Sequence, residues 1–233
     1  VPKIDTETER VAEAEAVVRY HHKDLGIVDP GRYINLLEET KLSHYLDLYV
    51  FEEVCKTLHR WEISGIPLIP VAVNFAGATL KQESIAEKML HLIEKYHVRC
   101  EYLEVEVSES GNDMNQEMLA ETSSKIRKAN VRVILDHFGA KDSSFSILSL
   151  MEFDGLKLDK SLITNIVGNA RSRIVAQAVI DICRQLGAFV QAAGVETQDQ
   201  LNVLKELGCD YVQGSLFNKP ITIETFEVRY MKE

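Results

Sequence analysis

The amino-acid sequence predicts an α/β fold, a TIM-like (β/α)8 barrel with an antiparallel first strand. Along its 233 residues, short β-rich runs alternate with longer helical patterns, and the connections between them are short. Repeated βα units of this kind form a parallel sheet covered by helices. About eight strand-like runs in this length favour closure into a barrel. A doubly wound open sheet is the alternative fold, but no glycine-rich phosphate fingerprint follows the first strand.

The first strand is predicted to be antiparallel because the chain opens with a β-hairpin. The run VPKID leads into a polar turn over residues 5–9, and RVAEAEAVVRY (residues 10–20) follows the turn. After this hairpin the pattern becomes strand then helix. A helix is expected to begin at Asp29 and Pro30, because aspartate is a good N-cap and proline suits the first helical position.

The rest of the chain continues the alternation of strands and helices. Apolar residues at helical spacing, from Leu46 to Leu58, predict a second helix. Further helices are predicted at residues 85–96, 118–129, 144–150, 172–186 and 198–207, between the strand-like runs VAVNF, YLEVEV, VRVIL, GLKL, AFVQAA and YVQG. Gly187 and Gly208 stand just past the last two helices, where a left-handed C-terminal cap is expected.

Composition limits the classes of function. With 45% hydrophobic and 27% charged residues, the chain can bury a large core, as one barrel or two small domains. No run approaches the length of a membrane span. The net charge of -10 argues against a nucleic acid polymer as partner, because such binding needs a face where lysine and arginine outnumber acids. An anionic ligand would need a local positive pocket.

The cysteines and the N-terminus indicate a cytoplasmic piece of a longer protein. Cys55, Cys100, Cys183 and Cys209 lie within apolar patterns without close pairing, which is typical of reduced core thiols. The chain opens on Val1, without an initiator Met, a signal peptide or a targeting motif. We therefore expect residues 1–233 to form a single domain cut from a multidomain protein.

Four strand-like runs end in side chains that suit a divalent cation: Glu15, Asn74, Glu106 and Asp136. Hard oxygen ligands from separate strand ends are how a barrel builds such a site. In LEVEVSE, Glu104 and Glu106 point to one face of the strand. If that face looks into the barrel mouth, desolvation and mutual repulsion demand a cation or a partner. A solvated acidic face is the alternative, but the joint pattern favours the metal site.

These segments, with FVQAAGVET, LKLD and GCDYVQG downstream, resemble in order the EAL domain, whose active members hydrolyse the bacterial second messenger cyclic di-GMP. The resemblance covers nearly the whole chain. The family's Glu-Ala-Leu motif, followed closely by arginine, is matched by residues 15–19, with Val17 in place of leucine. The resemblance implies that Glu15, Asn74, Glu106 and Asp136 bind Mg²⁺ or Mn²⁺.

The resemblance also implies catalytic and ligand-binding residues. Lys157 would help to hold the attacking water, and Glu109 would brace the neighbouring active-site loop. Arg19 would approach a phosphate of the dinucleotide. The full set of implied ligand contacts is Arg19, Val17, Asp159, Gln213 and Glu196. Two contacts of the family are absent, because Val1 stands in place of a glutamine and Ser215 in place of a tyrosine.

The departures from the family pattern concern its second metal. His137 replaces the second aspartate of the Asp-Asp-Phe-Gly motif, and Ala193 replaces the first glutamate of Glu-Gly-Val-Glu. In active relatives these acids serve the second metal, and the glutamate is the proposed general base. A general base contributes roughly 100- to 10,000-fold to the rate. The loop that should read Thr-Gly-Tyr has Lys141 in place of glycine, which predicts a different loop shape.

His137 has two interpretations. It can ligate a transition metal or accept a proton, which leaves room for a weak activity. The favoured interpretation is that its side chain packs or caps locally. Glu196 lies three residues beyond Ala193 and cannot take the place of the missing glutamate without rearrangement.

Three functions follow from these residues. The leading hypothesis is a degenerate EAL domain that acts as a cyclic di-GMP receptor or regulatory module, with one metal site and little or no hydrolysis. The second is an active or weakly active phosphodiesterase that gives the linear dinucleotide. The third is a protein-interaction adaptor that does not bind nucleotide. The resemblance further implies an upstream sensory or GGDEF-type domain, and a homodimer formed through the loop and helix near the altered segment.

Overall fold

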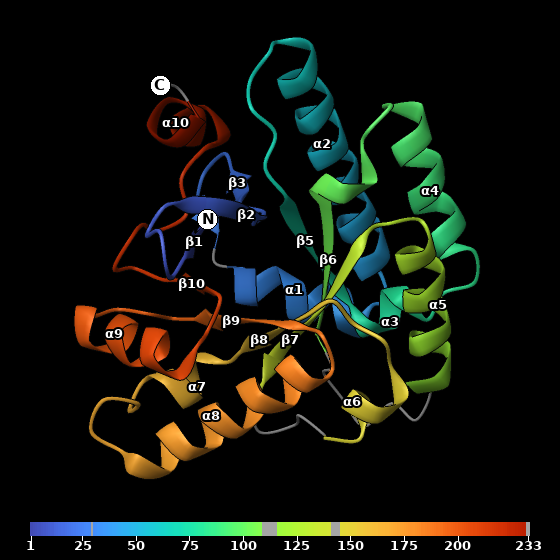
Figure 1. Cartoon of the computed structure of the whole chain (residues 1–233). Coiled ribbons are helices and arrows are strands. Elements are labelled where there is room, and N and C mark those ends of the chain that lie inside the picture. The colour runs from blue at the N-terminus through green and yellow to red at the C-terminus, as the bar shows by residue number, and fades with distance from the viewer. Residues whose placement is uncertain (29, 109–115, 141–144, 232–233) are drawn as a thin grey trace.

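A closed barrel lies at the centre of the computed structural model, which describes all residues except 29, 109–115, 141–144 and 232–233. Within the described residues, eight strands close in the order β1-β10-β9-β8-β7-β6-β5-β2 (Figure 1). Their bounds are β1 Pro2–Asp5, β2 Val11–Ala16, β5 Val71–Ala76, β6 Leu103–Ser108, β7 Arg132–Phe138, β8 Gly155–Leu158, β9 Phe189–Ala193 and β10 Tyr211–Gln213.

Strand directions confirm the predicted fold class. β1 pairs antiparallel with both β10 and β2, whereas each neighbouring pair among the other seven strands is parallel. The barrel is therefore a TIM-like (β/α)8 barrel whose first strand runs against the rest.

The second predicted strand is too long. β2 ends at Ala16, and the chain then forms a separate antiparallel hairpin of β3 (Tyr20–His22) and β4 (Gly26–Val28), which the sequence did not predict. His22 stabilises the hairpin turn, because its Nδ1 accepts hydrogen bonds from the backbone N–H groups of Asp24 and Leu25. Gly26 completes the turn with a φ of 69°, a conformation that glycine adopts without strain.

The helices lie outside the barrel, with α2, α4 and α5 along one side and α8 and α9 along another (Figure 1). Their bounds are α1 Pro30–Glu39, α2 Ser43–Ile63, α3 Gly77–Leu80, α4 Ile85–Lys95, α5 Gln116–Lys128, α6 Ile147–Leu150, α7 Lys160–Ile163, α8 Ala170–Gln185, α9 Gln198–Leu207 and α10 Ile223–Phe226. The short helices α3, α7 and α10 were not predicted.

Several helix boundaries differ from the prediction, among them the starts of α8 and α6. α8 begins at Ala170, two residues before the predicted start. The side chain of Asn169 caps the helix there, because it accepts hydrogen bonds from the backbone N–H groups of Arg171 and Ser172. α6 begins only at Ile147, and the predicted start at residue 144 lies outside the described residues. Gly187 and Gly208 have φ values of 73° and 81°, which confirms the predicted left-handed caps.

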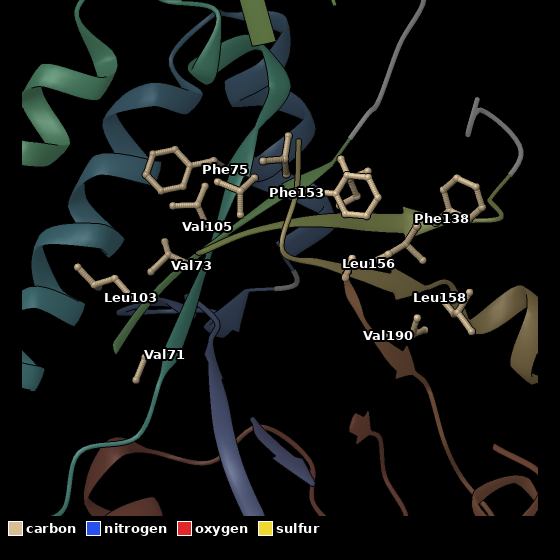
Figure 2. Packing of buried hydrophobic residues seen from close by; sticks show 14 of the residues in the cluster. Val71, Val73, Phe75, Leu103, Val105, Phe138, Phe153, Leu156, Leu158 and Val190 are labelled. Atoms are coloured by element: carbon tan, nitrogen blue, oxygen red, sulfur yellow. The ribbon is translucent and has the colours of Figure 1, made fainter. Parts of the chain in front are cut away.

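The hydrophobic core fills the space between the strands and the helices. Val71, Val73 and Phe75 of β5 lie beside Leu103 and Val105 of β6 on the helix side of the barrel (Figure 2). Burying each such side chain contributes roughly 1.5–3 kcal/mol. Because side chains alternate along a strand, the residues between them point into the barrel, which therefore has a polar interior.

Two further properties concern the whole chain. None of the helices formed by the described residues is long and apolar enough to cross a membrane. All four cysteines are free; Cys55, Cys183 and Cys209 are buried, and Cys100 is half-buried.

Candidate functional site

The barrel interior holds buried charged side chains in two layers. β2 contributes Glu13 to the lower layer and Glu15 to the upper layer, and β6 contributes Glu104 and Glu106 in the same way. The upper layer lies at the carboxyl ends of the parallel strands, where sites form in barrels of this type.

In the upper layer, Lys157 of β8 lies among three carboxylates. Its Nζ is 3.0 Å from Glu15 Oε2, 2.7 Å from Glu106 Oε2 and 3.9 Å from Asp136 Oδ1. Two amide groups also hold Glu15: Asn74 Nδ2 donates to its Oε1 at 2.6 Å, and Gln213 Nε2 donates at 2.7 Å to Oε2, the oxygen that Lys157 contacts. The structure thus brings together six residues that the sequence placed at one site.

In the lower layer, Lys3 of β1 lies between carboxylates. Its Nζ is 2.8 Å from Glu104 Oε2 and 2.9 Å from Glu106 Oε1. Arg132 pairs with Glu104 and, at 2.9 Å, with Glu13. Glu104 therefore faces fixed cations inside the barrel and does not line the mouth cavity.

Sequence reasoning missed Lys3. The sequence does place this lysine between apolar neighbours in a predicted strand. Because side chains alternate along a strand, a side chain at such a position can point into the barrel. Lys3 is only 1% exposed, and its cross-strand neighbour in the hairpin is Glu13. A buried ammonium requires partners of this kind.

Burial and neighbouring charges shift the pKa values in opposite directions. Burial opposes ionisation of Glu15, but the Lys157 charge and the hydrogen bonds from Gln213 and Asn74 hold its pKa well below the ordinary value. Burial raises the pKa of Glu106, although Lys157 and Lys3 partly offset this. Burial also opposes the charge of Lys157, yet the surrounding carboxylates raise its pKa well above the usual value.

A cavity of about 510 Å³ opens above the upper layer. Its floor includes Glu15, Asn74, Asp136, Lys157, Ala193 and Gln213, its rim includes Val17, Arg19 and His137, and α1 and α2 supply apolar walls. The exposed Arg19 guanidinium donates a hydrogen bond to the carbonyl of Val18 at 2.8 Å. The cavity therefore combines an acidic floor, one arginine on the rim and largely apolar walls that also include Glu38 and Asp47. Apolar walls suit the flat parts of a ligand, and the arginine suits an anionic part.

His137 differs from the favoured interpretation of local packing or capping. Its side chain is 62% exposed, with Nδ1 at 3.1 Å from Asp159 Oδ2 and Nε2 at 3.4 Å from Asp136 Oδ2. Its φ of 57° is a conformation that residues other than glycine rarely adopt. The imidazole thus lies between carboxylates at the ends of two strands instead of packing.

Other predicted residues lie elsewhere. Asp159 caps α7 by accepting a hydrogen bond from the backbone N–H of Ser161 at 2.9 Å, and it lies outside the lining of the cavity. Glu196 is exposed and is also outside that lining. Glu109 and Lys141, for which the sequence also predicted a role or a loop shape, lie outside the described residues.

The donor set of the upper layer fits a hard divalent cation, whereas its arrangement does not present an open site. Three carboxylates and an amide oxygen are the ligands that Mg²⁺ and Mn²⁺ prefer. Among the described residues, however, no group of three or more His, Cys, Asp and Glu side chains is arranged to hold a metal ion. The Lys157 ammonium lies where their oxygens converge.

Acidic side chains outnumber basic ones in the two layers. Within the part of the chain that the structure describes, the layers contain five carboxylates and three cationic side chains. The negative excess is smaller than this formal count near neutral pH, because burial raises the pKa values of Glu13 and Glu106. The five acids are Glu13, Glu15, Glu104, Glu106 and Asp136, and the three bases are Lys3, Arg132 and Lys157.

The structure is a (β/α)8 barrel with an acidic mouth, and the chain belongs to the EAL domain family, whose family model matches residues 1–220. It is 33% identical over 217 residues to the cyclic di-GMP phosphodiesterase NbdA of Pseudomonas aeruginosa, covering 93% of this chain and 28% of NbdA. It is 32% identical over 226 residues to the signaling protein YkoW of Bacillus subtilis, covering 97% and 28%. The chain thus spans less than a third of the length of either relative.

Solved structures share the fold. The PaMucR phosphodiesterase in complex with c-di-GMP superposes with a TM-score of 0.88 at 24% identity, covering 97% of this chain and 91% of that chain. The FimX EAL domain of Xanthomonas citri, also in complex with c-di-GMP, gives a TM-score of 0.82 at 19% identity, covering 92% and 83%.

Proposed function

We propose that this EAL domain binds cyclic di-GMP as a receptor or regulatory module and hydrolyses it little or not at all. One observation carries the proposal: Glu15, Asp136 and Lys157 line the mouth cavity, with Glu106 buried beside Lys157, while a methyl group stands at position 193 in the same cavity.

Several features support binding. Relatives with this fold, PaMucR and FimX, have structures named as complexes with c-di-GMP. The Arg19 guanidinium lies on the rim, where it can pair with a phosphate. Gln213 Oε1 is a buried acceptor without a hydrogen-bond partner among the described residues, so it is available to a donor of the ligand. Binding a dinucleotide uses these groups and needs no general base.

The same cavity argues against hydrolysis. Attack of water on a phosphodiester requires an activated water and an acceptor for its proton. Ala193 offers no acceptor, and its neighbour in register, Gln213, is an amide. The upper carboxylates are already paired with Lys157. Glu196, the nearest retained acid of the motif, is exposed outside the cavity.

The proposal includes one divalent cation, Mg²⁺ or Mn²⁺, held by Glu15, Asn74, Glu106 and Asp136. Carboxylate and amide oxygens such as these are the ligands that a hard divalent cation prefers. A relative, BlrP1 of Klebsiella pneumoniae, has a structure named as a complex with calcium and cyclic di-GMP, with a TM-score of 0.81 at 21% identity. When bound, such a cation would attract the phosphate oxygens of the ligand.

The proposal also places residues 1–233 as one domain of a longer cytoplasmic signalling protein, with an upstream sensory or GGDEF-type domain and a homodimeric state. One relative is named a bifunctional diguanylate cyclase and cyclic di-GMP phosphodiesterase, MucR, and the chain covers 33% of its length. Its name supports a multidomain arrangement of this kind.

A weakly active phosphodiesterase is the second candidate, because His137 lies on the rim between two carboxylates. An imidazole held in this way can accept a proton. The names of the relatives NbdA and MucR also favour an enzyme.

Calorimetry with cyclic di-GMP, with and without Mg²⁺ or Mn²⁺, tests the proposed binding, and chromatography of the same mixtures tests hydrolysis. We expect binding heat and no linear dinucleotide. Absence of heat at high micromolar ligand would favour an adaptor without nucleotide binding, and steady turnover would favour the enzyme. The double variant Ala193→Glu with His137→Asp is expected to gain hydrolysis that each single variant lacks.

A further inference from the structure

We propose that α1 and the β3–β4 hairpin form a lid beside the mouth cavity, and that cyclic di-GMP in this cavity stabilises the closed position of the lid. The lid is defined by β3 and β4, within residues 20–28, and by α1, residues 30–39. This inference rests on the proposed function and adds the conformational step that accompanies binding.

The lid lies in a long stretch of the chain that has no buried residue. Every described residue from 16 to 42 is half-buried or exposed, and this is the longest such stretch among the described residues. Leu25 and Ile27 of the hairpin are 70% and 66% exposed. Because a segment of this kind buries little apolar surface, the free energy of its local opening is expected to be low.

α1 and α9 have the same length but pack differently. Each has ten residues. No residue of α1 is buried, whereas the buried residues of α9 are Gln200, Leu201, Val203 and Leu204. A helix of ten residues is marginal by itself in water, and packing of an apolar face supplies most of the stability of helices in proteins. α1 therefore lacks the packing that stabilises α9.

Few polar contacts hold the lid to the barrel. The Tyr33 hydroxyl donates to the carbonyl of Val18 at 3.3 Å, which is long for a bond of this type. The Tyr33 ring also packs edge-on against Tyr20, but this contact lies within the lid. Among the described residues, no ion pair joins the lid to the rest of the chain. The lid can therefore open without breaking a strong polar contact.

One face of α1 is available to a ligand. Ile34 and Leu37 of α1 line the cavity of about 510 Å³, as do Leu46 and Val50 of α2. A ligand with flat apolar parts in this cavity would bury these side chains, and burial of apolar surface is favourable. Because the contact with α1 exists only while α1 is closed, ligand binding shifts the lid toward its closed position.

Hydrogen exchange of the whole protein, followed by mass spectrometry of its peptides, tests the stability of the lid. Without nucleotide, we expect the amides of α1 to exchange at least tenfold faster than those of α9, the helix of equal length. Saturating cyclic di-GMP should slow the exchange of α1 at least tenfold and leave that of α9 unchanged. Exchange of α1 as slow as that of α9 before nucleotide is added would overturn the lid.

Two substitutions at Asn35 test whether binding depends on the closed helix. Asn35 is exposed on α1 and does not line the cavity, so its replacement changes the helix and leaves the lining intact. Glycine is less favourable than alanine within a helix by an amount equal to about a fourfold change in an equilibrium. We therefore expect cyclic di-GMP to bind Asn35→Ala about fourfold more tightly than Asn35→Gly, measured by calorimetry.

The same pair of substitutions at Asn202, an exposed residue of α9, is the matched control and should give equal affinities. Equal affinities of the two Asn35 variants would overturn the coupling between binding and closure. Binding heat without any change in the exchange of α1 would overturn the lid and leave the proposed function standing. Absence of binding heat for the wild type and all variants would overturn the proposed function and the lid together.

Discussion

The two layers of the barrel interior are built from the same strands, yet only one of them suits a ligand. β2 and β6 each place one glutamate in each layer, but Glu104 faces Lys3 and Arg132 deep inside the barrel, whereas Glu15 lies below an open cavity. The lower layer therefore holds its own counter-ions. A buried carboxylate in this barrel is therefore structural when cationic side chains surround it, and it is available to a ligand when it lies next to an open cavity. The residue type, glutamate in both layers, does not decide between these roles.

The largest effect is expected when the Lys3 ammonium, which contacts a glutamate in each layer, is removed. Lys3→Met leaves Glu104 and Glu106 without their shared buried partner. Breaking a buried ion pair on one side costs about 3–5 kcal/mol, so we expect a loss of that size in the free energy of unfolding, measured with urea.

An exposed lysine provides the matched control for that change. Lys56→Met removes a surface ion pair with Glu53, and such pairs contribute little. The variant should unfold at nearly the same urea concentration as the wild type. A similarly small effect of Lys3→Met would show that the lower layer does not depend on its lysine.

A second prediction concerns the pH dependence of the lower layer. Burial, reinforced by Glu104, raises the pKa of Glu13 to about 7 from an ordinary value of 4.5. Because the folded state binds this proton more tightly, stability falls as pH rises from 4.5 to 7, and the full penalty remains above 7. A shift of this size corresponds to a penalty of roughly 3–3.5 kcal/mol.

Glu13→Gln should remove that part of the pH dependence. We expect the variant to gain stability relative to the wild type at pH 8 and to gain little at pH 5, measured by urea unfolding at both values. Glu7→Gln, an exposed glutamate on the same hairpin, is the control. Equal differences at the two pH values would contradict a buried titrating Glu13.

The smallest expected effect concerns Arg19, on the rim of the cavity above the upper layer. Arg19 lies on the cavity rim, and its side chain donates to the neighbouring carbonyl of Val18, so Arg19→Met should leave stability unchanged. The affinity for cyclic di-GMP should fall about tenfold through loss of a charge-assisted phosphate contact. Calorimetry measures this, with the exposed Arg10→Met as control. Unchanged affinity would place the phosphates elsewhere.

Sequence patterns predicted the upper layer well because they depend on local rules. Alternation along LEVEVSE fixes the face of Glu106, and parallel strands bring their carboxyl ends to one mouth, so the gathering of Glu15, Asn74 and Asp136 followed. The alternation of strand-like and helical segments predicted the closed barrel, and the hairpin at the start of the chain predicted its antiparallel first strand.

The lower layer and the rim depended on contacts that local patterns do not contain. Lys3 meets Glu104, 101 residues away, only because the barrel closes with a particular stagger between strands. His137 takes a left-handed backbone conformation, which places its imidazole between Asp136 and Asp159 instead of in a local contact. The β3–β4 hairpin forms through the side chain of His22, a turn partner that no periodicity reveals.

A ³¹P NMR spectrum of equimolar protein and cyclic di-GMP with excess Mg²⁺ tests the central claim most directly, because one spectrum reports both binding and hydrolysis. We predict a shifted or broadened phosphodiester signal that persists for hours, without the phosphomonoester signal of the linear dinucleotide. Steady growth of the monoester signal, or a phosphodiester signal identical to that of the free ligand, would contradict a barrel that binds cyclic di-GMP without hydrolysing it.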